Sequence, residues 1–562
     1  VNTRYVVGIL DALKEEKDIT IDEKLLKVYE DWTKEHPYDV GEGWGRVPWS
    51  QEEMPLEDSV VADAAANNDI AIVVVGRTAG EDQDNTPDPG SYLLTDTERD
   101  MIVKVSSKFA RTAVLLNVGN IIDMKWVKEC NPSAVMYVWQ GGQEGGHGVC
   151  DALTGRVNPC GKLTDTIAYD IRDYPSTENF GDERKNYYKE DIYVGYRYFE
   201  SFAKDKVLYP FGFGLSYTAF EIASAITDVT ENAITVEAVV KNTGDTAGKE
   251  VVEVYVEAPQ GMLGKPSRVL AGFAKTQVIA PGEEEKVTIV IPKKAYASYD
   301  DSGVTGHKDS FLLEAGSYKI YAGADVRSAA LAGSYEQELQ VIEQLEEACA
   351  PSEQFERMTR DADGTLVYKK IPAREFGPYD RIEKPEEIAY TGDKGYKLAD
   401  VYNKKITMDE FIAQLSDEQL IMLFHAEGMC SPKVTAGTAC AFGGLTEELR
   451  ALGIPATCTT DGPSGLRMDC GTKAFSLPNG TVIGCTFDLE LAQKLYEMTG
   501  YELRKNRVDS LLGPGMNIHR NPLNGRNFEY ISEDPLMTGK MAAAQIKGLG
   551  IVGSTGTIKH FA

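Results

Sequence analysis

Short runs of apolar residues alternate with segments of helical periodicity through the first 140 residues of the chain. The runs at 71 to 76 ("AIVVVG"), 113 to 119 ("AVLLNVG") and 134 to 139 ("AVMYVW") predict strands. Between the first two, "TDTERDMIVKVSSKFA" begins with Thr95 and has Glu98 three positions on, a capping box that predicts a helix start. Apolar strands separated by helices predict a parallel sheet covered on both faces, so we expect a doubly wound α/β sandwich over residues 1–216.

Two polar loops follow strands of this predicted sheet. The first carries Glu81 with Asp82 and Asp84 close by, and the second is "QGGQEGGHG" at 140–148. Because ligands bind at the carboxyl ends of parallel strands, we expect both loops at one edge of the sheet. The glycines of the second loop lack the Lys-Ser/Thr of a phosphate-binding loop, and its Glu144 and His147 are interpreted as turn and helix-start residues. Composition alone favours the interpretation that the acids of the first loop, Glu81 among them, are simply exposed to solvent.

The hydrophobic period changes after residue 216. Segments such as "AITVEAVVKNTG" and "EKVTIVIP" alternate apolar and polar residues and are separated by "NTGD" and "APGEEE" turns, which predicts an antiparallel β-sandwich over 217–335. Prolines and the lack of periodicity predict a linker strap over 336–404.

The last region, 405–562, begins with a predicted helix, "TMDEFIAQLSDEQLIMLF", and then repeats helix, glycine-rich loop and short strand. Its specific polar segments are "TTDGPSGLRM", "GPGMNIHRNPLNGRNFEYISEDP" and "GTIKHFA". Each follows a short apolar segment, which is the position of loops at the catalytic face of a (β/α) barrel.

Composition excludes several classes of function. Lys and Arg number 58 against 87 Asp and Glu, giving a formal charge of −29, which disfavours nucleic acid and anionic membranes as partners. No apolar run approaches the roughly 20 residues of a transmembrane helix. The nine scattered cysteines form no metal-binding pattern and are interpreted as reduced thiols. Reduced thiols favour a cytoplasmic location, although the chain begins with Val1 and a removed signal peptide leaves secretion open.

Those polar segments, with "RTAGEDQD", "YPFGFGLSYTAF" and "NPCGKLTDTIAYD", closely resemble glycoside hydrolase family 3, the β-glucosidase family, over almost the whole chain. The order resembles the branch in which the α/β sandwich and a fibronectin type III-like domain precede the barrel. The resemblance implies a multidomain α/β fold: a doubly wound α/β sandwich, a fibronectin type III-like β-sandwich and a partial (β/α)8 TIM-like barrel. It also implies a retaining mechanism with an aspartate nucleophile and a glutamate acid/base.

Site residues transfer from the family one by one. Glu81 matches the general acid/base, and like-charge repulsion from Asp82 and Asp84 would favour its protonated form. The expected substrate-binding residues are Asp461, Arg526, Lys559 and His560. Charged groups suit sugar hydroxyls because charge-assisted hydrogen bonds are strong.

Other residues of these motifs are expected to have structural roles. His519 and Arg520 are interpreted as support for the loop that contains them. The tryptophans Trp44, Trp49 and Trp139 are candidates for a wall that stacks on the aglycone, although burial is the commoner role of an aromatic side chain.

The expected nucleophile is missing. The family places it in a Ser/Thr-Asp-Trp segment, and the only Asp-Trp pair here, Asp31-Trp32, lies in the first region after Glu30. The last region has fewer than about 160 residues, whereas a closed eight-stranded barrel needs about 200 or more. We therefore expect this chain to be part of a longer polypeptide, either cut or completed by a second polypeptide. A homo-oligomer is left open.

The leading hypothesis is an exo-acting retaining β-glucosidase that hydrolyses terminal non-reducing β-D-glucosyl residues of β-glucosides or cello-oligosaccharides. The resemblance leaves open a β-xylosidase, a β-N-acetylglucosaminidase, a phosphorylase variant, or a fragment that binds sugar without turnover. It implies no metal or organic cofactor, because two carboxylates suffice for the reaction.

Overall fold

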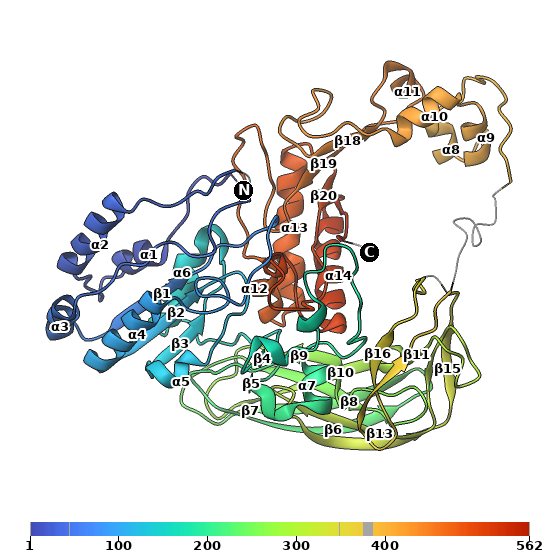
Figure 1. Ribbon diagram of the computed structural model, residues 1–562. Helices are drawn as coiled ribbons and strands as arrows, with labels where there is room; N and C mark the ends of the chain where they lie inside the picture. The colour runs from blue at the N-terminus through green and yellow to red at the C-terminus, as the bar shows by residue number, and fades with distance from the viewer. Residues whose placement is uncertain (1, 44, 348, 375–385, 561–562) are drawn as a thin grey trace.

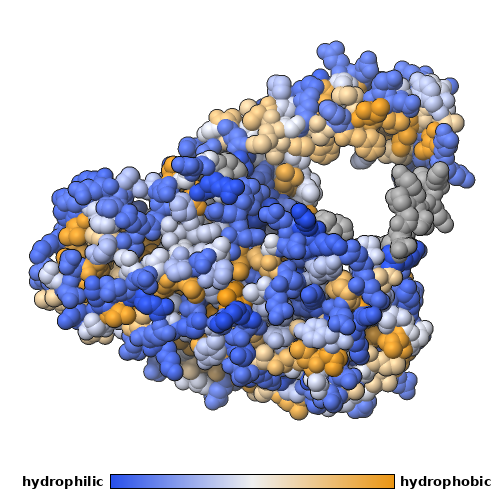
Figure 2. All heavy atoms as spheres, viewed as in Figure 1, coloured by the Kyte–Doolittle hydropathy of each residue, from blue (hydrophilic) through white to orange (hydrophobic). Residues whose placement is uncertain are grey.

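The computed structural model describes residues 2–43, 45–347, 349–374 and 386–560. Three parts of the chain meet near the middle of the molecule (Figure 1): an α/β domain, a β-sandwich and the region from α12 (Gly480–Cys485) to α14 (Pro535–Ile551). The segment from α8 (Leu398–Tyr402) to α11 (Glu447–Ala451) stands apart from the α/β domain and the β-sandwich (Figures 1 and 2). It has a separate small core around Phe411, Leu415 and Leu452.

The α/β domain is built on a parallel sheet of order β1-β2-β3, as the apolar runs predict. The capping box of Thr95 and Glu98 is confirmed at the start of α4. The elements are α1 (Ile9–Glu15), α2 (Glu23–Glu35), α3 (Asp58–Asn67), β1 (Ala71–Gly76), α4 (Asp96–Lys108), β2 (Thr112–Asn117), α5 (Trp126–Cys130), β3 (Ala134–Tyr137), η1 (Gly142–Glu144), α6 (Gly145–Leu153), β4 (Ile167–Ala168), η2 (Ile171–Asp173), η3 (Thr177–Asn179), α7 (Tyr196–Phe202), η4 (Lys204–Lys206) and β5 (Val207–Tyr209).

The prediction that both faces of the sheet are covered is wrong at its edge strand β1. Val73 and Val75 pack into the main core of the domain with residues of α3 and α4. Ile72 and Val74 point the other way and are 37% and 42% exposed. The helices that pack on this strand therefore cover only one of its faces.

The β-sandwich has the antiparallel pairing that the period-2 segments predict. Its sheets have the orders β10-β7-β6, β14-β13-β8-β9 and β11-β12-β15. The elements are β6 (Phe220–Val229), β7 (Ala233–Asn242), β8 (Val251–Glu257), β9 (Val269–Lys275), β10 (Glu284–Pro292), η5 (Lys293–Tyr296), β11 (Ser298–Asp300), β12 (Ser310–Leu313), β13 (Gly316–Gly323), β14 (Ala330–Gln337) and β15 (Gln340–Gln344). Strand β8 is buried on both faces, because Val251 and Tyr255 pack into the core that contains α13 and α14.

The segment 336–404 contains strands that its composition did not predict. β15 joins the β-sandwich by pairing with β12, and β16 (Glu356–Arg360) and β17 (Leu366–Lys370) form a hairpin. Part of the predicted strap, 375–385, lies outside the described residues.

The last region contains a four-stranded sheet of order β18-β19-β20-β21, in which β18 is antiparallel to β19 and the other pairs are parallel. The single helix predicted for 407–424 is wrong: Ser416 caps a second helix there by accepting a hydrogen bond from the Gln419 backbone N–H. The elements are α8 (Leu398–Tyr402), α9 (Met408–Ala413), α10 (Asp417–Phe424), β18 (Cys440–Gly443), α11 (Glu447–Ala451), β19 (Ala456–Asp461), α12 (Gly480–Cys485), α13 (Leu489–Lys505), β20 (Ser510–Leu512), η6 (Asn527–Glu529), α14 (Pro535–Ile551) and β21 (Thr555–Gly556).

Candidate active site

Three parallel strands of the last region end at one edge of their sheet. Asp461 is the last residue of β19, and Lys559 and His560 follow β21. Arg526 lies in the long loop between β20 and α14. Because parallel strands share the edge at which their carboxyl ends lie, residues far apart in sequence converge there.

Asp461 and Lys559 form an ion pair at this edge. Lys559 Nζ donates to Asp461 Oδ1 at 2.9 Å, and the two side chains are 16% and 30% exposed. Arg467 Nη1 lies 3.9 Å from the other oxygen of Asp461. The carboxylate is therefore flanked by two cations and still accessible to a ligand.

Arg526 connects three other groups. Its Nε donates to Glu529, and its Nη2 lies 3.0 Å from His560 Nε2 and 3.2 Å from Glu81 Oε1. Burial raises the pKa of Glu529, although the charge of Arg526 opposes this effect. The guanidinium is thus the centre of a network that includes a carboxylate from the α/β domain.

His560 is neutral in this network. Arg526 can only donate, so Nε2 of His560 accepts, and Nδ1 donates to the hydroxyl of Tyr530 at 3.0 Å. Burial, together with the charges of Arg526 and Lys559, lowers the pKa of His560 to about 4. The ring therefore adds no further positive charge to the network.

Glu81 reaches this edge from the loop after β1, and its side chain is 50% exposed. Its ion-pair partner at this edge is the cation Arg526. The Asp84 carboxylate accepts a hydrogen bond from the Gly525 backbone N–H at 2.9 Å instead.

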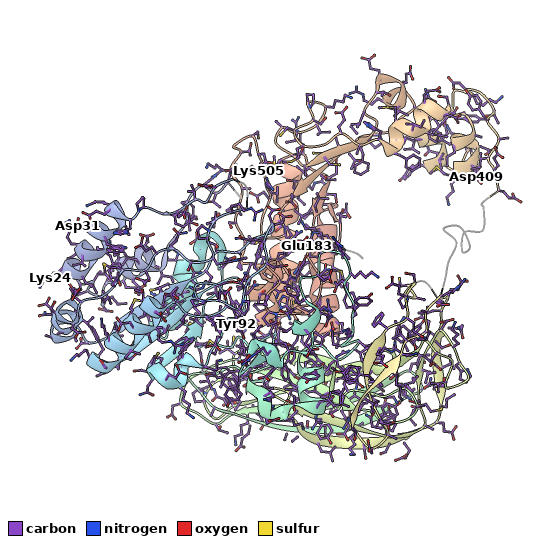
Figure 3. The ribbon with its side chains drawn as sticks, viewed as in Figure 1. Lys24, Asp31, Tyr92, Glu183, Asp409 and Lys505 are labelled. Carbon is purple, nitrogen blue, oxygen red and sulfur yellow. The ribbon has the colours of Figure 1, made fainter. Side chains whose placement is uncertain are left out.

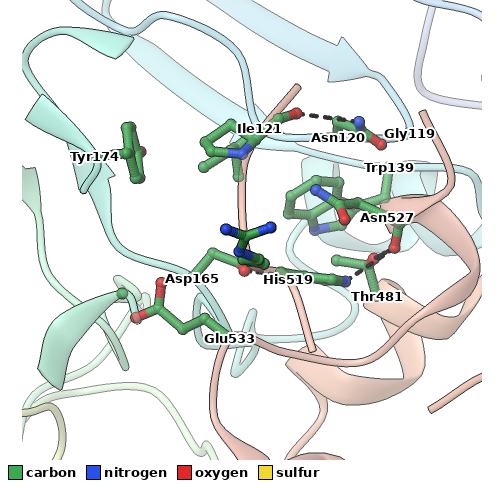
Figure 4. A pocket seen from close by; sticks show the side chains of 13 residues that line it. Gly119, Asn120, Ile121, Trp139, Asp165, Tyr174, Thr481, His519, Asn527 and Glu533 are labelled. Atoms are coloured by element: carbon green, nitrogen blue, oxygen red, sulfur yellow. Dashed lines mark hydrogen bonds and ion pairs between the residues drawn. The ribbon is translucent and has the colours of Figure 1, made fainter. Parts of the chain in front are cut away.

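His519 and Arg520 make contacts that hold the loop between β20 and α14. His519 Nδ1 hydrogen-bonds Asp165 at 2.7 Å, and its Nε2 hydrogen-bonds the Asn527 backbone oxygen at 2.9 Å (Figure 4). Arg520 pairs with Glu190. Both residues connect this loop to the α/β domain.

In the glycine-rich loop at 140–148, Glu144 is the last residue of η1 and forms an ion pair with His147 of α6.

The three tryptophans differ in their surroundings. Trp139 is buried against Tyr137 and lines the pocket of Figure 4, whereas Trp49 packs near Gly80. Trp44 lies outside the described residues.

Asp31, of the Asp-Trp pair, lies on α2 and forms ion pairs with Lys27 and Lys34. In Figure 3 it is at the outer side of the α/β domain, far from α13 and α14.

The sequence did not predict roles for Glu529 and Tyr530 in the network, or for Asp84 beside it. The first two belong to the same "NGRNFEY" segment as Arg526, so the signal was present in the motif. Asp84 was interpreted only as a charge beside Glu81, because its partner Gly525 is 441 residues away in sequence.

Models of protein families match the chain in three successive segments. Residues 1–217 match the glycosyl hydrolase family 3 C-terminal domain, 250–326 a fibronectin type III-like domain, and 393–562 the glycosyl hydrolase family 3 N-terminal domain. The chain belongs to glycoside hydrolase family 3, with its domains in the reversed order that the motifs predicted.

Several similar proteins are named as β-glucosidases. A β-glucosidase of Ruminococcus albus is 57% identical over 569 residues, spanning all of this chain and 59% of that protein. β-Glucosidase A of Butyrivibrio fibrisolvens is 36% identical over 640 residues, spanning all of this chain and 74% of that protein. The crystal structure of a β-glucosidase from Paenibacillus barengoltzii superimposes with a TM-score of 0.96 at 50% identity, covering all of this chain and 63% of that one. The chain thus spans about three fifths of the first and third of these relatives.

Proposed function

We propose that this chain supplies the acid/base and the sugar-binding groups of an exo-acting retaining β-glucosidase that acts on terminal non-reducing β-D-glucosyl residues of β-glucosides or cello-oligosaccharides. The observation that carries the proposal is the convergence of Glu81 with Arg526 and His560, beside the pair Asp461–Lys559, at one sheet edge. The β-glucosidase names of the relatives support the same assignment.

Each group has a role that its surroundings suit. Asp461 accepts hydrogen bonds from sugar hydroxyls, and Lys559 donates to a neighbouring hydroxyl while holding that carboxylate in place. Arg526 and the neutral ring of His560 bind further hydroxyls. In the family's reaction, an aspartate nucleophile that this chain does not contain bonds to the anomeric carbon while Glu81 gives a proton to the departing oxygen. Glu81 then takes a proton from the water that displaces this aspartate.

Chemical rescue tests the proposal on the chain as it exists. Without the family's nucleophile, azide can attack the anomeric carbon, forming a C–N bond while the C–O bond breaks and Glu81 protonates the leaving oxygen. We expect azide-dependent release of nitrophenol from 4-nitrophenyl β-glucoside, with the inverted α-glucosyl azide as product. Release that is absent with azide, although glucose binds, would favour a sugar-binding fragment without turnover.

Matched substrates separate the related specificities. The same assay with 4-nitrophenyl β-xyloside and 4-nitrophenyl β-N-acetylglucosaminide should give slower release than the glucoside, because a site built to bind a hydroxyl penalises a sugar that lacks it. Faster release from the xyloside would indicate a β-xylosidase instead, and faster release from the N-acetylglucosaminide would indicate a β-N-acetylglucosaminidase.

Partners and location are further parts of the proposal. We infer a β-glucoside or oligosaccharide as the small-molecule partner, and co-purification would detect any second polypeptide that associates with this chain. All nine cysteines are free thiols, which supports a cytoplasmic location. Among the described residues, no helix is long and apolar enough to cross a membrane.

A further inference from the structure

The loop that carries Glu81 is fastened to the loop that carries Arg526 by hydrogen bonds between their backbones and side chains. The Asn85 backbone N–H donates to the Leu523 oxygen at 2.7 Å. Asp84 Oδ1 accepts from the Gly525 N–H at 2.9 Å. We call residues 83–85 and 522–525 together the interloop junction.

A second loop of the α/β domain strengthens the junction. Asn120, which is 9% exposed, donates through Nδ2 to the Asn524 oxygen at 2.6 Å and lies 3.2 Å from the Pro522 oxygen. Asn120 also lines the pocket of Figure 4, beside the His519 contact with Asn527.

The junction is packed too closely for a side chain at Gly525. A Cβ there would lie 1.8 Å from the Gln83 backbone oxygen and 2.9 Å from the Gly80 oxygen. Gly525 is buried, so its N–H would lose its partner if the Asp84 carboxylate were removed.

Both chain neighbours of Arg526 are therefore anchored toward the α/β domain. Gly525 is held by Asp84, and Asn527 is held through His519, which in turn contacts Asp165. The backbone on both sides of Arg526 is thus tied to the α/β domain, and its Nη2 lies 3.2 Å from Glu81 Oε1.

We propose that Asp84 is a positioning residue that sets the place of Glu81 relative to Arg526 by holding the interloop junction together. This inference rests on the proposed function only in naming Glu81 as the proton donor. Asp84 acts on the reaction through the position of the acid loop, because its carboxylate holds the Gly525 N–H.

Leaving-group dependence distinguishes positioning of the acid from a general loss of structure. In the azide-dependent assay, Asp84→Ala should slow release from phenyl β-glucoside by about 10- to 100-fold, because small misplacements of a catalytic group cost that much. Release from 2,4-dinitrophenyl β-glucoside, whose leaving group needs little protonation, should change by less than about twofold. Asp84→Asn keeps an acceptor oxygen and should restore most of the rate. Equal losses with both substrates would overturn the proposal.

Hydrogen exchange tests the junction without turnover. Peptides covering 521–527 should exchange faster in Asp84→Ala and in Asn120→Asp, which loses its donor, than in the wild type. Asp88→Asn, which removes an exposed carboxylate elsewhere in the same loop, is the control and should leave exchange unchanged. Unchanged exchange in Asp84→Ala would overturn the proposal, whereas altered exchange in a chain that cleaves no glucoside would refute the proposed function and not the junction.

Discussion

Removal of the Asp461 carboxylate should weaken glucose binding while leaving the fold intact. The group is 30% exposed, and its Oδ1 accepts from Lys559 Nζ at 2.9 Å at the edge where the strands end. A hydrogen bond to a charged group contributes about 1.5 to 3 kcal/mol. Partial exposure favours the lower half of this range, which corresponds to about 10- to 40-fold weaker binding at about 1.4 kcal/mol per decade.

Calorimetric titration of glucose into Asp461→Ala and the wild type would measure this loss. Asp469→Asn is the matched control, because Asp469 also pairs with Arg467 but lies beyond the strand end. It should bind glucose as the wild type does. An Asp461→Ala variant that melts at the wild-type temperature and binds glucose within twofold of the wild type would refute the assignment of Asp461 as a sugar ligand.

Three further predictions concern the surroundings of the site. Arg77→Met should destabilise the chain by about 3 to 5 kcal/mol in denaturant titration, because it leaves buried Glu98 without its bidentate partner; Arg99→Met, at an exposed pair, should cost about 1 kcal/mol or less. The folded-state pKa of His560, about 4, is below the unfolded value near 6.5, so its contribution to stability is complete above pH 6.5 and is lost as the pH falls towards 4. The melting temperature of His560→Gln should therefore fall less between pH 7 and 4 than that of the wild type; parallel curves would contradict this. Gly525→Ala should weaken glucose binding and lower the melting temperature, since its Cβ would lie 1.8 Å from a backbone oxygen of the acid loop; wild-type values for both would contradict the close packing.

Local sequence patterns predicted the parts of the fold that depend on local chemistry. Strands β1 and β2 follow from their apolar runs, and the start of α4 follows from the capping box of Thr95 and Glu98. The same reasoning failed at Ser416, where one helix was predicted and a second helix begins. The helical spacing of apolar residues continues on both sides of Ser416, so the break between the helices was not visible in it. Strands β15–β17 were missed because their apolar and polar residues do not alternate clearly. They are strands because of their pairing partners, which a local pattern does not show.

Contacts across domains were beyond those patterns. The convergence of Asp461 and Lys559 could be anticipated, since both follow parallel strands. The approach of Glu81 to Arg526 depends on how the α/β domain docks on the last region, and no local periodicity encodes that docking. The family motif named both residues, but it did not indicate that Asp84 holds their loops together.

The central claim is that Glu81, from the α/β domain, donates the proton at a sugar site on the last region. Its most direct test is the azide-dependent rate of Glu81→Gln with aryl β-glucosides of different leaving groups. We predict a loss of about 10²- to 10⁴-fold for phenyl β-glucoside and a rate close to the wild type for 2,4-dinitrophenyl β-glucoside, because only the first needs general acid catalysis. An unchanged rate with phenyl β-glucoside, or the same loss with both substrates, would contradict the claim.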